Sequence, residues 1–515
     1  MKTCIATVIK NEHEYLDEWI QYHLDLGIDH IFIFEDFDSE SHSQIIDKYG
    51  DVVTLRSIGD ILDDYEKSEA IELKQTKRKS VHNIYIKACL KHIKNQYDLY
   101  DWCFMTDCDE FITTNGRNLN DILSLYKTCD ALVLQWAIYG ASGLLKKPDY
   151  SLHGVVDTYT EKFDNGIIKN ENDLTLCKTC YNMRTFKESN FRNTHRPSNS
   201  CRWREIDYRY SFDQHSVIYI RHYITKSWEE YRWKIEERGF MWGLKRNYDF
   251  FFNINPDLNY LKDQLTSNKE TLVVLPYVQN KSQGNEIRLT LNGWKKYCTF
   301  NYHFIVVGEF DESLTKDYPW VEFIHKKSVD WRNDQYVPHL DIMSKFNYIM
   351  EKYSHEYNGF IYITDDNYAI KPFTLEDIAS IYYFSPSFSG NSETPASYWN
   401  HDKWKTRQLL DREGLPSVNY TTHFPYYMEF SKLKEIMDKF NLLEESYVFD
   451  DIYFNYFSHC KPIPVSEIRL GVWSSKIFKE CFNNAINNPN IKFICNSVEG
   501  WSKKLEEELD KLTKI

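Results

Sequence analysis

The sequence predicts an α/β protein with two tandem domains, each built on a mostly parallel central sheet. Apolar runs of strand length alternate with amphipathic helical segments, as expected for parallel strands covered by helices on both faces. The alternation starts again after residue 270, and 515 residues exceed what one hydrophobic core usually organises. A polar segment at 253–269 separates the two patterns, so we predict domains at 1–265 and 266–515.

The first half shows the alternation in order. Its elements are expected as a strand at 3–10, a helix at 14–27 with Gly27 as its stop, strands at 30–35 and 52–57, a helix near 81–94, and strands at 102–106 and 131–136. The ends of parallel strands at one sheet edge form the usual ligand site of such folds. Both "IKNE" and "TDCDE" stand at such ends, which makes them candidate site segments.

The second half repeats this architecture without residue-level identity. Its elements are expected as strands at 271–276, 300–308 and 360–364, and helices at 285–297 and 339–353. We interpret this as a repeated arrangement of elements and not as a sequence repeat.

The composition limits the classes of partner. The 62 basic and 76 acidic residues give a net charge of −14, which argues against a nucleic-acid partner. No window approaches the ~20 apolar residues of a membrane span. We therefore expect a cytoplasmic protein, with peripheral association at the inner face of the cell membrane left open because of the basic run at 74–80. Most of the 12 cysteines should then be reduced.

One cysteine pair, Cys177 and Cys180, has the spacing of a zinc half-site, with His195 and Cys201 downstream. The second half of such a motif lacks regular spacing here. A pair of reduced thiols on a strand or loop is the favoured interpretation.

The stretch "WCFMTDCDEFIT" (102–113) places carboxylates directly after a buried strand. Like charges repel there and lose hydration, so folding alone does not explain them. In an extended chain residues i and i+2 point the same way, so Asp107 and Asp109 are expected to converge. Two hard oxygen donors suit Mg²⁺ or Mn²⁺ and leave positions for phosphate oxygens. The alternative is a solvated acidic turn.

The stretch "FIYITDDNYAIKPF" (360–373) raises the same question. Asp365 and Asp366 are adjacent, so they share a metal site only if the chain turns, as Asn367 and Pro372 favour. An Asx-type turn that closes the strand is the structural alternative.

The first half resembles the family 92 glycosyltransferases and their bacterial relatives in the family 2 group. The similarity lies in five blocks: "IKNEHEYLDEWIQYHLDLGIDHIFIFED", "DWCFMTDCDEF", "WAIYGASG", "CKTC…NTHRP" and "IRHYITKSWEEY". The stretch "KQTKRKSVHNIYIKAC" departs from the family pattern. The resemblance implies a GT-A (Rossmann-like) fold with a metal held by Asp107 and Asp109.

The resemblance also implies roles for further residues. Nucleotide-sugar contacts fall on Lys10, Asn11, Glu12, Asp36 and Cys108; acceptor contacts fall on Trp136, Gly140 and Ser142; and His222 approaches the diphosphate or metal. For His222 an ordinary place in a strand core remains the alternative.

The second half resembles bacterial capsule-type sugar transferases, including the Stealth phosphotransferase group. The matching pieces are "GNEIRLTL", "DDNYAIKPF" and "HFPYYMEFSKLKEI". The resemblance implies Asp365 and Asp366 as metal ligands, Arg288 as a phosphate contact and His423 as base or ligand. Asp450 is expected to act as a general base, or else to cap the helix that follows it.

These inferences predict a bifunctional, Mn²⁺- or Mg²⁺-dependent glycosyltransferase. Its donors would be nucleotide sugars, with a UDP-sugar favoured, and its acceptor a glycan or lipid-linked glycan of a bacterial surface polysaccharide such as capsule or lipopolysaccharide. Two alternatives for the second half remain open: a sugar-phosphate transferase and a non-catalytic carbohydrate-binding module. The sequence leaves the oligomeric state open.

Overall fold

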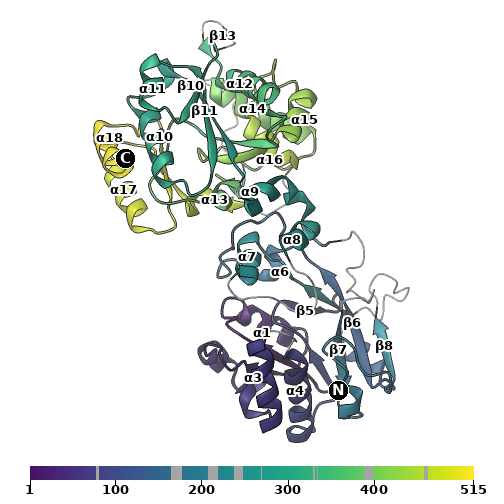
Figure 1. The fold of residues 1–515 in the computed structure, drawn as a ribbon. Helices are drawn as coiled ribbons and strands as arrows, with labels where there is room; N and C mark the ends of the chain where they lie inside the picture. Colours follow the sequence, from purple (N-terminus) through teal and green to yellow (C-terminus); the bar gives the residue numbers. More distant parts are fainter. Residues whose placement is uncertain are drawn as a thin grey trace. The chain divides into compact units, whose positions relative to one another are not determined.

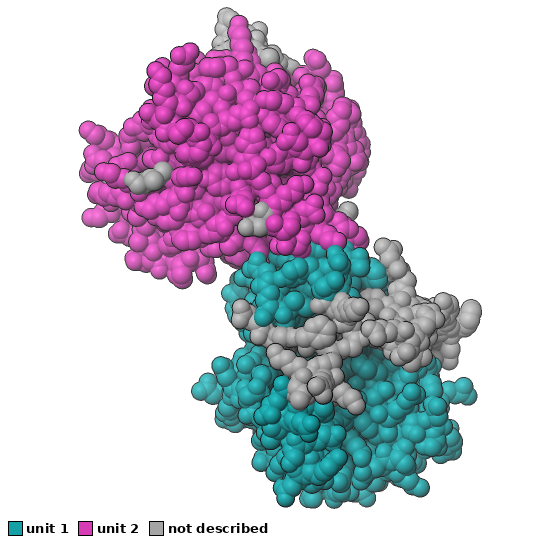
Figure 2. All heavy atoms as spheres, viewed as in Figure 1, with its two compact units in different colours: residues 1–142, 147–255 teal, residues 143–146, 256–515 magenta. Residues whose placement is uncertain are grey.

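The computed structural model describes residues 1–76, 81–163, 177–206, 218–236, 247–267, 269–328, 331–332, 335–387, 398–457 and 462–514. The chain divides into two compact units (Figure 2): unit 1 contains residues 1–142 and 147–255, and unit 2 contains residues 143–146 and 256–515. The boundary between the units falls between residues 255 and 256, before the predicted boundary at residue 265. The segment after it, which forms η4 (Pro256–Leu261) and α9 (Lys262–Ser267), belongs to unit 2, where Tyr260 stacks on Tyr427.

Unit 1 alternates strands and helices from its first residues (Figure 1). Its elements are β1 (Thr3–Ile9), α1 (Leu16–Asp25), β2 (His30–Glu35), α2 (Ser43–Ile46), η1 (Asp47–Val52), β3 (Val53–Ser57), η2 (Ile58–Asp60), α3 (Asp64–Thr76), α4 (His82–Gln96), β4 (Trp102–Met105), β5 (Glu110–Thr113), α5 (Leu119–Ser124), β6 (Ala131–Ile138), α6 (Val155–Thr158), β7 (Cys177–Asn182), η3 (Glu188–Asn190), β8 (Trp203–Ile206), β9 (Tyr219–His222), α7 (Trp228–Glu236) and α8 (Tyr248–Ile254).

The central sheet of unit 1 has the strand order β3-β2-β1-β4-β7-β6-β9-β5, with β8 beside β6. Strands β3, β2, β1 and β4 are parallel, and β7 is antiparallel to both β4 and β6. The carboxyl ends of β1, β2 and β4 therefore meet at one edge, and β7 begins at that same edge.

The helices of unit 1 are held in place by their packing on the two sides of this sheet. One buried cluster joins α3 and α4 to β1, β2 and β4 through apolar side chains that include Ala70, Tyr85 and Ile86. On α1, Trp19 donates its indole N–H to the carbonyl of Glu110 at 2.8 Å, and His23 Nε2 accepts the amide of Ile112 at 3.1 Å. Helix α1 thus fixes strand β5 and the turn that precedes it.

Unit 2 begins with η4 and α9 and then follows a comparable order. Its further elements are β10 (Thr271–Val278), η5 (Gln279–Lys281), α10 (Glu286–Tyr297), β11 (Tyr302–Glu309), α11 (Glu312–Asp317), β12 (Val321–His325), β13 (Trp331–Arg332), β14 (Gln335–Tyr336), α12 (Pro338–Tyr353), β15 (Gly359–Tyr362), β16 (Asn367–Ala369), α13 (Leu375–Ala379), β17 (Tyr382–Tyr383), α14 (Tyr398–Arg412), β18 (Tyr426–Glu429), α15 (Phe430–Phe440), α16 (Phe449–Phe457), β19 (Ile463–Pro464), η6 (Val465–Glu467), β20 (Arg469–Val472), α17 (Phe478–Asn487), β21 (Phe493–Asn496) and α18 (Lys503–Thr513).

The main sheet of unit 2 has the order β12-β11-β10-β15-β18, with four parallel strands and an antiparallel β18. This repeats the order and directions of β3-β2-β1-β4-β7 in unit 1. A short strand follows the acidic cluster in each unit. In unit 1 this strand is β5, which pairs antiparallel with β9, and β9 runs parallel to β6. In unit 2 it is β16, which pairs antiparallel with β21, and β21 runs parallel to β20.

The predicted α/β class with mostly parallel sheets is confirmed. The expected strand at 30–35 coincides with β2, and the expected helix at 339–353 lies within α12. At the end of the chain, α18 packs on α10 and buries Leu505 and Leu509 completely. Across the described ranges, every helix is too short or too polar to traverse a bilayer.

Candidate active sites at two acidic turns

The first acidic cluster lies in a turn between β4 and β5. The amide of Glu110 donates to the carbonyl of Asp107 at 3.0 Å, so residues 107–110 reverse the chain direction. The extended geometry expected for Asp107 and Asp109 is therefore wrong. Their carboxylates sit on a tight turn and engage different neighbours.

Asp107 faces β7 and α4. Its Oδ2 accepts a hydrogen bond from Lys178 Nζ at 2.6 Å, and its Oδ1 lies 3.3 Å from His82 Nε2. Burial acts to raise the pKa of Asp107, but the positive charges of Lys178 and His82 outweigh it and hold the pKa below its usual range. The lysine side chain itself is only 4% exposed.

Asp109 faces β9 and α7 in the same manner. Its Oδ2 accepts a hydrogen bond from Lys234 Nζ at 3.0 Å, and its Oδ1 lies 3.5 Å from His222 Nε2. Burial again acts to raise the pKa of Asp109, and Lys234 and His222 lower it well below the usual value. Each aspartate thus has one lysine and one histidine beside it, contributed by elements far apart in the sequence.

Glu110 is a site residue that the sequence reasoning did not single out. It is fully buried, and its Oε2 accepts the amide of Asp107 at 3.1 Å. Burial raises the pKa of Glu110 well above its usual value, although Lys178 at 3.6 Å partly offsets this. The third carboxylate in "DCDE" was the available signal.

The loops after β1 and β2 carry the residues expected to bind a nucleotide. Lys10 pairs with Asp38 at 2.6 Å, and Asp36 accepts hydrogen bonds from Lys74 at 2.7 Å and Tyr85 at 3.1 Å. These contacts link the two loops at the sheet edge where the acidic turn also lies.

Asn11 and Glu12 complete this edge. Asn11 has a φ of +56° and its side-chain oxygen accepts the amide of Glu40 at 2.9 Å. The backbone amide of Glu12 donates to His42 at 3.1 Å, and its carboxylate accepts the Tyr15 hydroxyl. The structure therefore brings Lys10, Asn11, Glu12 and Asp36 together in one polar network.

The remaining predicted residues of unit 1 divide into two groups. Trp136 lies at the site, with its ring 4.2 Å from that of His222 in an edge contact. Cys108, Gly140 and Ser142 instead face inward. The thiol of Cys108 is 4% exposed, and a Cβ on Gly140 would lie 2.5 Å from the Asn255 side chain. Ser142 accepts the amides of residues 160 and 161 within the loop.

The cysteine pair lies on a strand, in agreement with the favoured interpretation. Cys177 and Cys180 are buried in β7, and Cys177 Sγ contacts the carbonyl of His195 at 3.0 Å. The eleven cysteines in the described ranges are all free thiols. Burial raises the pKa of Cys177 to about 12. The expectation of reduced thiols is confirmed for these residues.

The acidic turn supplies metal-binding donors of suitable chemistry. Asp107 and Asp109 each turn Oδ1 toward an imidazole nitrogen, and carboxylates with imidazoles are ligands that Mn²⁺ accepts and Mg²⁺ tolerates. Nowhere in the described ranges do three such side chains already converge on one point. A divalent ion bound here would compete with Lys178 and Lys234, which already bond to Asp107 and Asp109.

The second acidic cluster follows β15. Asp366 Oδ2 lies 3.1 Å from His423 Nδ1, and His423 has a φ of +44°. Burial acts to raise the pKa of Asp366, but His423 holds it below its usual value. Asp365 behaves differently, because burial together with Asp366 and Glu286 raises its pKa to about 7. The two adjacent carboxyl groups therefore differ in charge near neutral pH.

Asp450 and Asp451 lie in the first turn of α16. Asp451 has a structural role: its Oδ1 accepts the amide of Tyr420, and its Oδ2 accepts the Thr421 hydroxyl at 3.2 Å. This holds the segment that leads to His423. Asp450 does not occupy the cap position, and burial raises its pKa to about 6.

Arg288, on α10, donates to Asp317 at 2.6 Å. Its guanidinium also acts electrostatically on Tyr277, a residue near Asp365. Arg288, the predicted phosphate contact, therefore already pairs with the carboxylate of Asp317, at the margin of the second acidic cluster.

His339, at the start of α12, was not predicted. Its ring is 5% exposed and stacks on Trp399 with 5.1 Å between centroids. Within the described residues, neither ring nitrogen has a hydrogen-bond partner. Burial and the nearby Lys403 lower the pKa of His339 to about 3. No sequence pattern distinguishes this histidine from the other polar residues of the helix.

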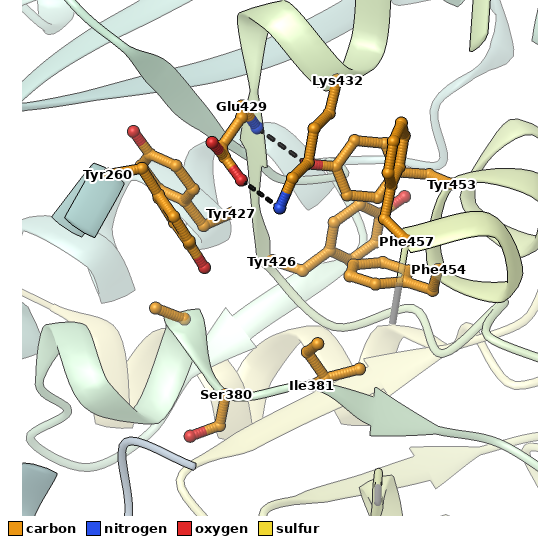
Figure 3. A pocket seen from close by; sticks show the side chains of 11 residues that line it. Tyr260, Ser380, Ile381, Tyr426, Tyr427, Glu429, Lys432, Tyr453, Phe454 and Phe457 are labelled. Atoms are coloured by element: carbon orange, nitrogen blue, oxygen red, sulfur yellow. Dashed lines mark hydrogen bonds and ion pairs between the residues drawn. The ribbon is translucent and has the colours of Figure 1, made fainter. Parts of the chain in front are cut away.

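Unit 2 also contains an aromatic cavity (Figure 3). It lies among Tyr260, Ala379, Ser380, Ile381, Tyr426, Tyr427, Glu429, Lys432, Tyr453, Phe454 and Phe457. Lys432 pairs with Glu429, whose amide donates to the Tyr453 hydroxyl at 2.9 Å. The cavity volume of about 40 Å³ is well below the ~150 Å³ that accommodates a six-membered ring. This cavity therefore does not accommodate a sugar ring in the described conformation.

The two acidic clusters share one further relation. Strands β7 and β18 both run antiparallel to the strand that precedes the cluster. Lys178 lies at the start of β7 and pairs with Asp107, and His423 lies just before β18 and pairs with Asp366. In both units, a basic side chain on this strand or just before it contacts the acidic cluster.

Comparison with protein-family models finds no match, and comparison with curated proteins finds none either.

Proposed function

We propose that the protein is a metal-dependent, bifunctional glycosyltransferase built from two units of the GT-A type. It would move sugars from nucleotide-sugar donors, UDP-sugars above all, onto a glycan or lipid-linked glycan of a bacterial surface polysaccharide such as capsule or lipopolysaccharide. Such donors are cytoplasmic, and the acceptor would be met at the inner face of the membrane.

The observation that carries this proposal is the position of the acidic turn. Asp107 and Asp109 follow β4 at the sheet edge where Lys10, Glu12 and Asp36 cluster after β1 and β2. In open α/β sheets this edge is where ligands bind. A nucleotide at the first two loops would bring its diphosphate toward the carboxylates.

The chemistry follows from the side chains present. A divalent ion held by Asp107, Asp109 and His222 would neutralise negative charge on a departing diphosphate. Trp136 packs edge-on against His222, with 4.2 Å between the ring centroids. In unit 2, Asp450 has a pKa of about 6, so it is ionised at neutral pH and remains basic enough to accept a proton from an acceptor hydroxyl.

The rival proposal keeps the glycosyltransferase in unit 1 and assigns unit 2 to sugar-phosphate transfer or to carbohydrate binding without catalysis. The contact between Asp366 and His423, together with the ionisable Asp450, favours a working site over a binding module.

The test measures donor cleavage by the full chain with a panel of nucleotide sugars, with and without Mn²⁺. Asp109→Asn should suppress one transfer by about 100-fold or more, and Asp366→Asn should suppress a different one. Asp98→Asn, at an exposed position on unit 1, is the matched control. Full activity in EDTA would remove the metal role. If Asp366→Asn changes nothing while Asp109→Asn stops every reaction, unit 2 is not catalytic.

A further inference from the structure

Lys226 occupies a buried polar turn between β9 and α7. The side chains of Thr225, Lys226 and Ser227 are 0%, 1% and 0% exposed. Lys226 also has a φ of +52°, a left-handed backbone conformation that non-glycine residues rarely adopt. A lysine is therefore held in strained backbone with its ammonium group inside the protein.

The ammonium group of Lys226 lies against an aromatic ring. Its Nζ is 3.5 Å from the centroid of the Tyr15 ring. Over the described residues, this ring contact stands without a hydrogen bond or ion pair of Nζ beside it. A cation–π contact compensates only part of the cost of removing an ammonium from water. A leucine or methionine would fill the same space without that cost.

The carboxylates within electrostatic range of Lys226 already have partners. They are Asp109, bonded to Lys234; Glu230, bonded to the Tyr150 and Tyr159 hydroxyls; Glu12, bonded to Tyr15; and Glu18, bonded to the amides of Val155 and Val156. None of them approaches Nζ as an ion-pair partner. Burial and the neighbouring Lys234 lower the pKa of Lys226, and an anionic ligand would supply an ion-pair partner that favours the charged form.

We propose that Lys226 is an anion-binding residue that pairs with a phosphate oxygen of a diphosphate at the acidic turn of unit 1. This deepens the proposed function and rests on it. Lys226 and Lys234 both act on Asp109 from the α7 side, so the ligand meets two ammonium groups there. A diphosphate carries several negative charges and suits two such groups better than a single carboxylate does. Lysine serves as a point charge for phosphate.

The experiment uses isothermal titration of the full chain with UDP and with inorganic pyrophosphate, in the presence of Mn²⁺. Lys226→Met should weaken the binding of both probes by about 10- to 100-fold, the effect of losing one charged hydrogen bond. Lys226→Arg should retain most of the affinity. Lys48→Met, which removes a half-exposed lysine paired with Asp17, is the control and should change nothing.

The melting temperature supplies an independent measurement. Because Lys226→Met removes a buried ammonium with no anionic partner, the melting temperature should stay the same or rise. Should this variant not fold, Lys226→Gln keeps a polar side chain without charge and should show the same loss of affinity.

Unchanged pyrophosphate and UDP binding in the uncharged variants would overturn the inference, even if the wild type cleaves nucleotide sugars. If pyrophosphate binding is lost in these variants while the wild type cleaves no donor, the anion site stands and the proposed function fails.

Discussion

Replacing Lys178 by methionine removes the positive charge beside Asp107 and Glu110. At 2.6 Å and an effective dielectric constant of about 20, the pair with Asp107 has an attraction of roughly 6 kcal/mol. Water screens part of this attraction, because the Asp107 side chain is 36% exposed. The variant also no longer has the desolvation cost of burying the Lys178 ammonium group. We therefore expect the free energy of unfolding to fall by about 2–4 kcal/mol at pH 8.

The direction of the Asp107 pKa shift determines how the free energy of unfolding depends on pH. In the wild type the pKa of Asp107 is depressed, so its stabilising contribution is present above the unfolded value and is lost as the pH falls. In the variant only His82 still opposes burial and Asp109, so the pKa of Asp107 should rise and the folded variant should take up a proton between pH 8 and pH 4, which relieves part of its loss of stability. The difference between the two proteins should therefore be largest at pH 7–8 and should shrink toward pH 4.

Urea unfolding followed by tryptophan fluorescence at pH 8 and pH 4 measures both effects. Lys178→Arg should lose less stability, because the charge is retained. Lys94→Met, which breaks an exposed pair with Asp98, should leave the free energy of unfolding unchanged within experimental error. A Lys178→Met protein as stable as the wild type at pH 8, or equally destabilised at both pH values, would refute the reasoning.

Three further predictions concern unit 2 and are measured by the same unfolding method. His339→Phe should stabilise the protein by about 2 kcal/mol more at pH 5 than at pH 8, because the depressed pKa of His339 makes its protonation favour the unfolded chain as the pH falls below 6.5. Gly308→Ala should destabilise by about 3 kcal/mol or more, since the added Cβ would lie 1.9 Å from the Tyr277 carbonyl oxygen. Lys345→Met should cost about 3–5 kcal/mol by removing the ammonium group that pairs with the fully buried carboxylate of Asp341, and Asp341→Leu in the same chain should recover most of that loss.

The glycine and lysine variants each have a matched control. Gly414→Ala adds a Cβ into open space at a positive φ and should cost only about 1 kcal/mol. Lys352→Met breaks a more exposed pair with Glu322 and should cost less than Lys345→Met. Equal losses of stability for Gly308→Ala and Gly414→Ala, or for Lys345→Met and Lys352→Met, would contradict the assigned burial. A pH-independent effect of His339→Phe would contradict the charge state assigned to that histidine.

The sequence predicted the parallel strands well, because each is a short apolar run bounded by polar residues. The strand at 30–35 is such a case, with four buried residues between half-buried ends. The position of Asp107 and Asp109 after a central strand was predictable for the same reason. Their turn geometry was not, since it depends on hydrogen bonds that a linear pattern does not encode: Trp19 of α1 donates to the carbonyl of Glu110, and His23 of α1 accepts the amide of Ile112.

The basic partners of the carboxylates escaped prediction because they come from distant segments. Lys178 reaches Asp107 only because β7 runs antiparallel beside β4, and nothing in "LCKTCYN" indicates that direction. His82 lies at the start of α4, outside every segment that carries a predicted site residue. Lys226 stands between two elements in a backbone conformation that composition does not predict. Long-range pairing, not local propensity, decides which charges meet.

The strand order of unit 1 has a consequence for how the protein is made. Every described strand of its sheet lies before residue 236, as do Lys178 and Lys234, which contact the acidic turn, so none of the described strands of that sheet comes from unit 2. At synthesis rates of about 5–20 residues per second, the stretch from Pro256 to Ile515 takes roughly 10–50 s to emerge from the ribosome. The first sheet therefore has time to close, and its carboxylates to meet their cations, while the second is still being translated.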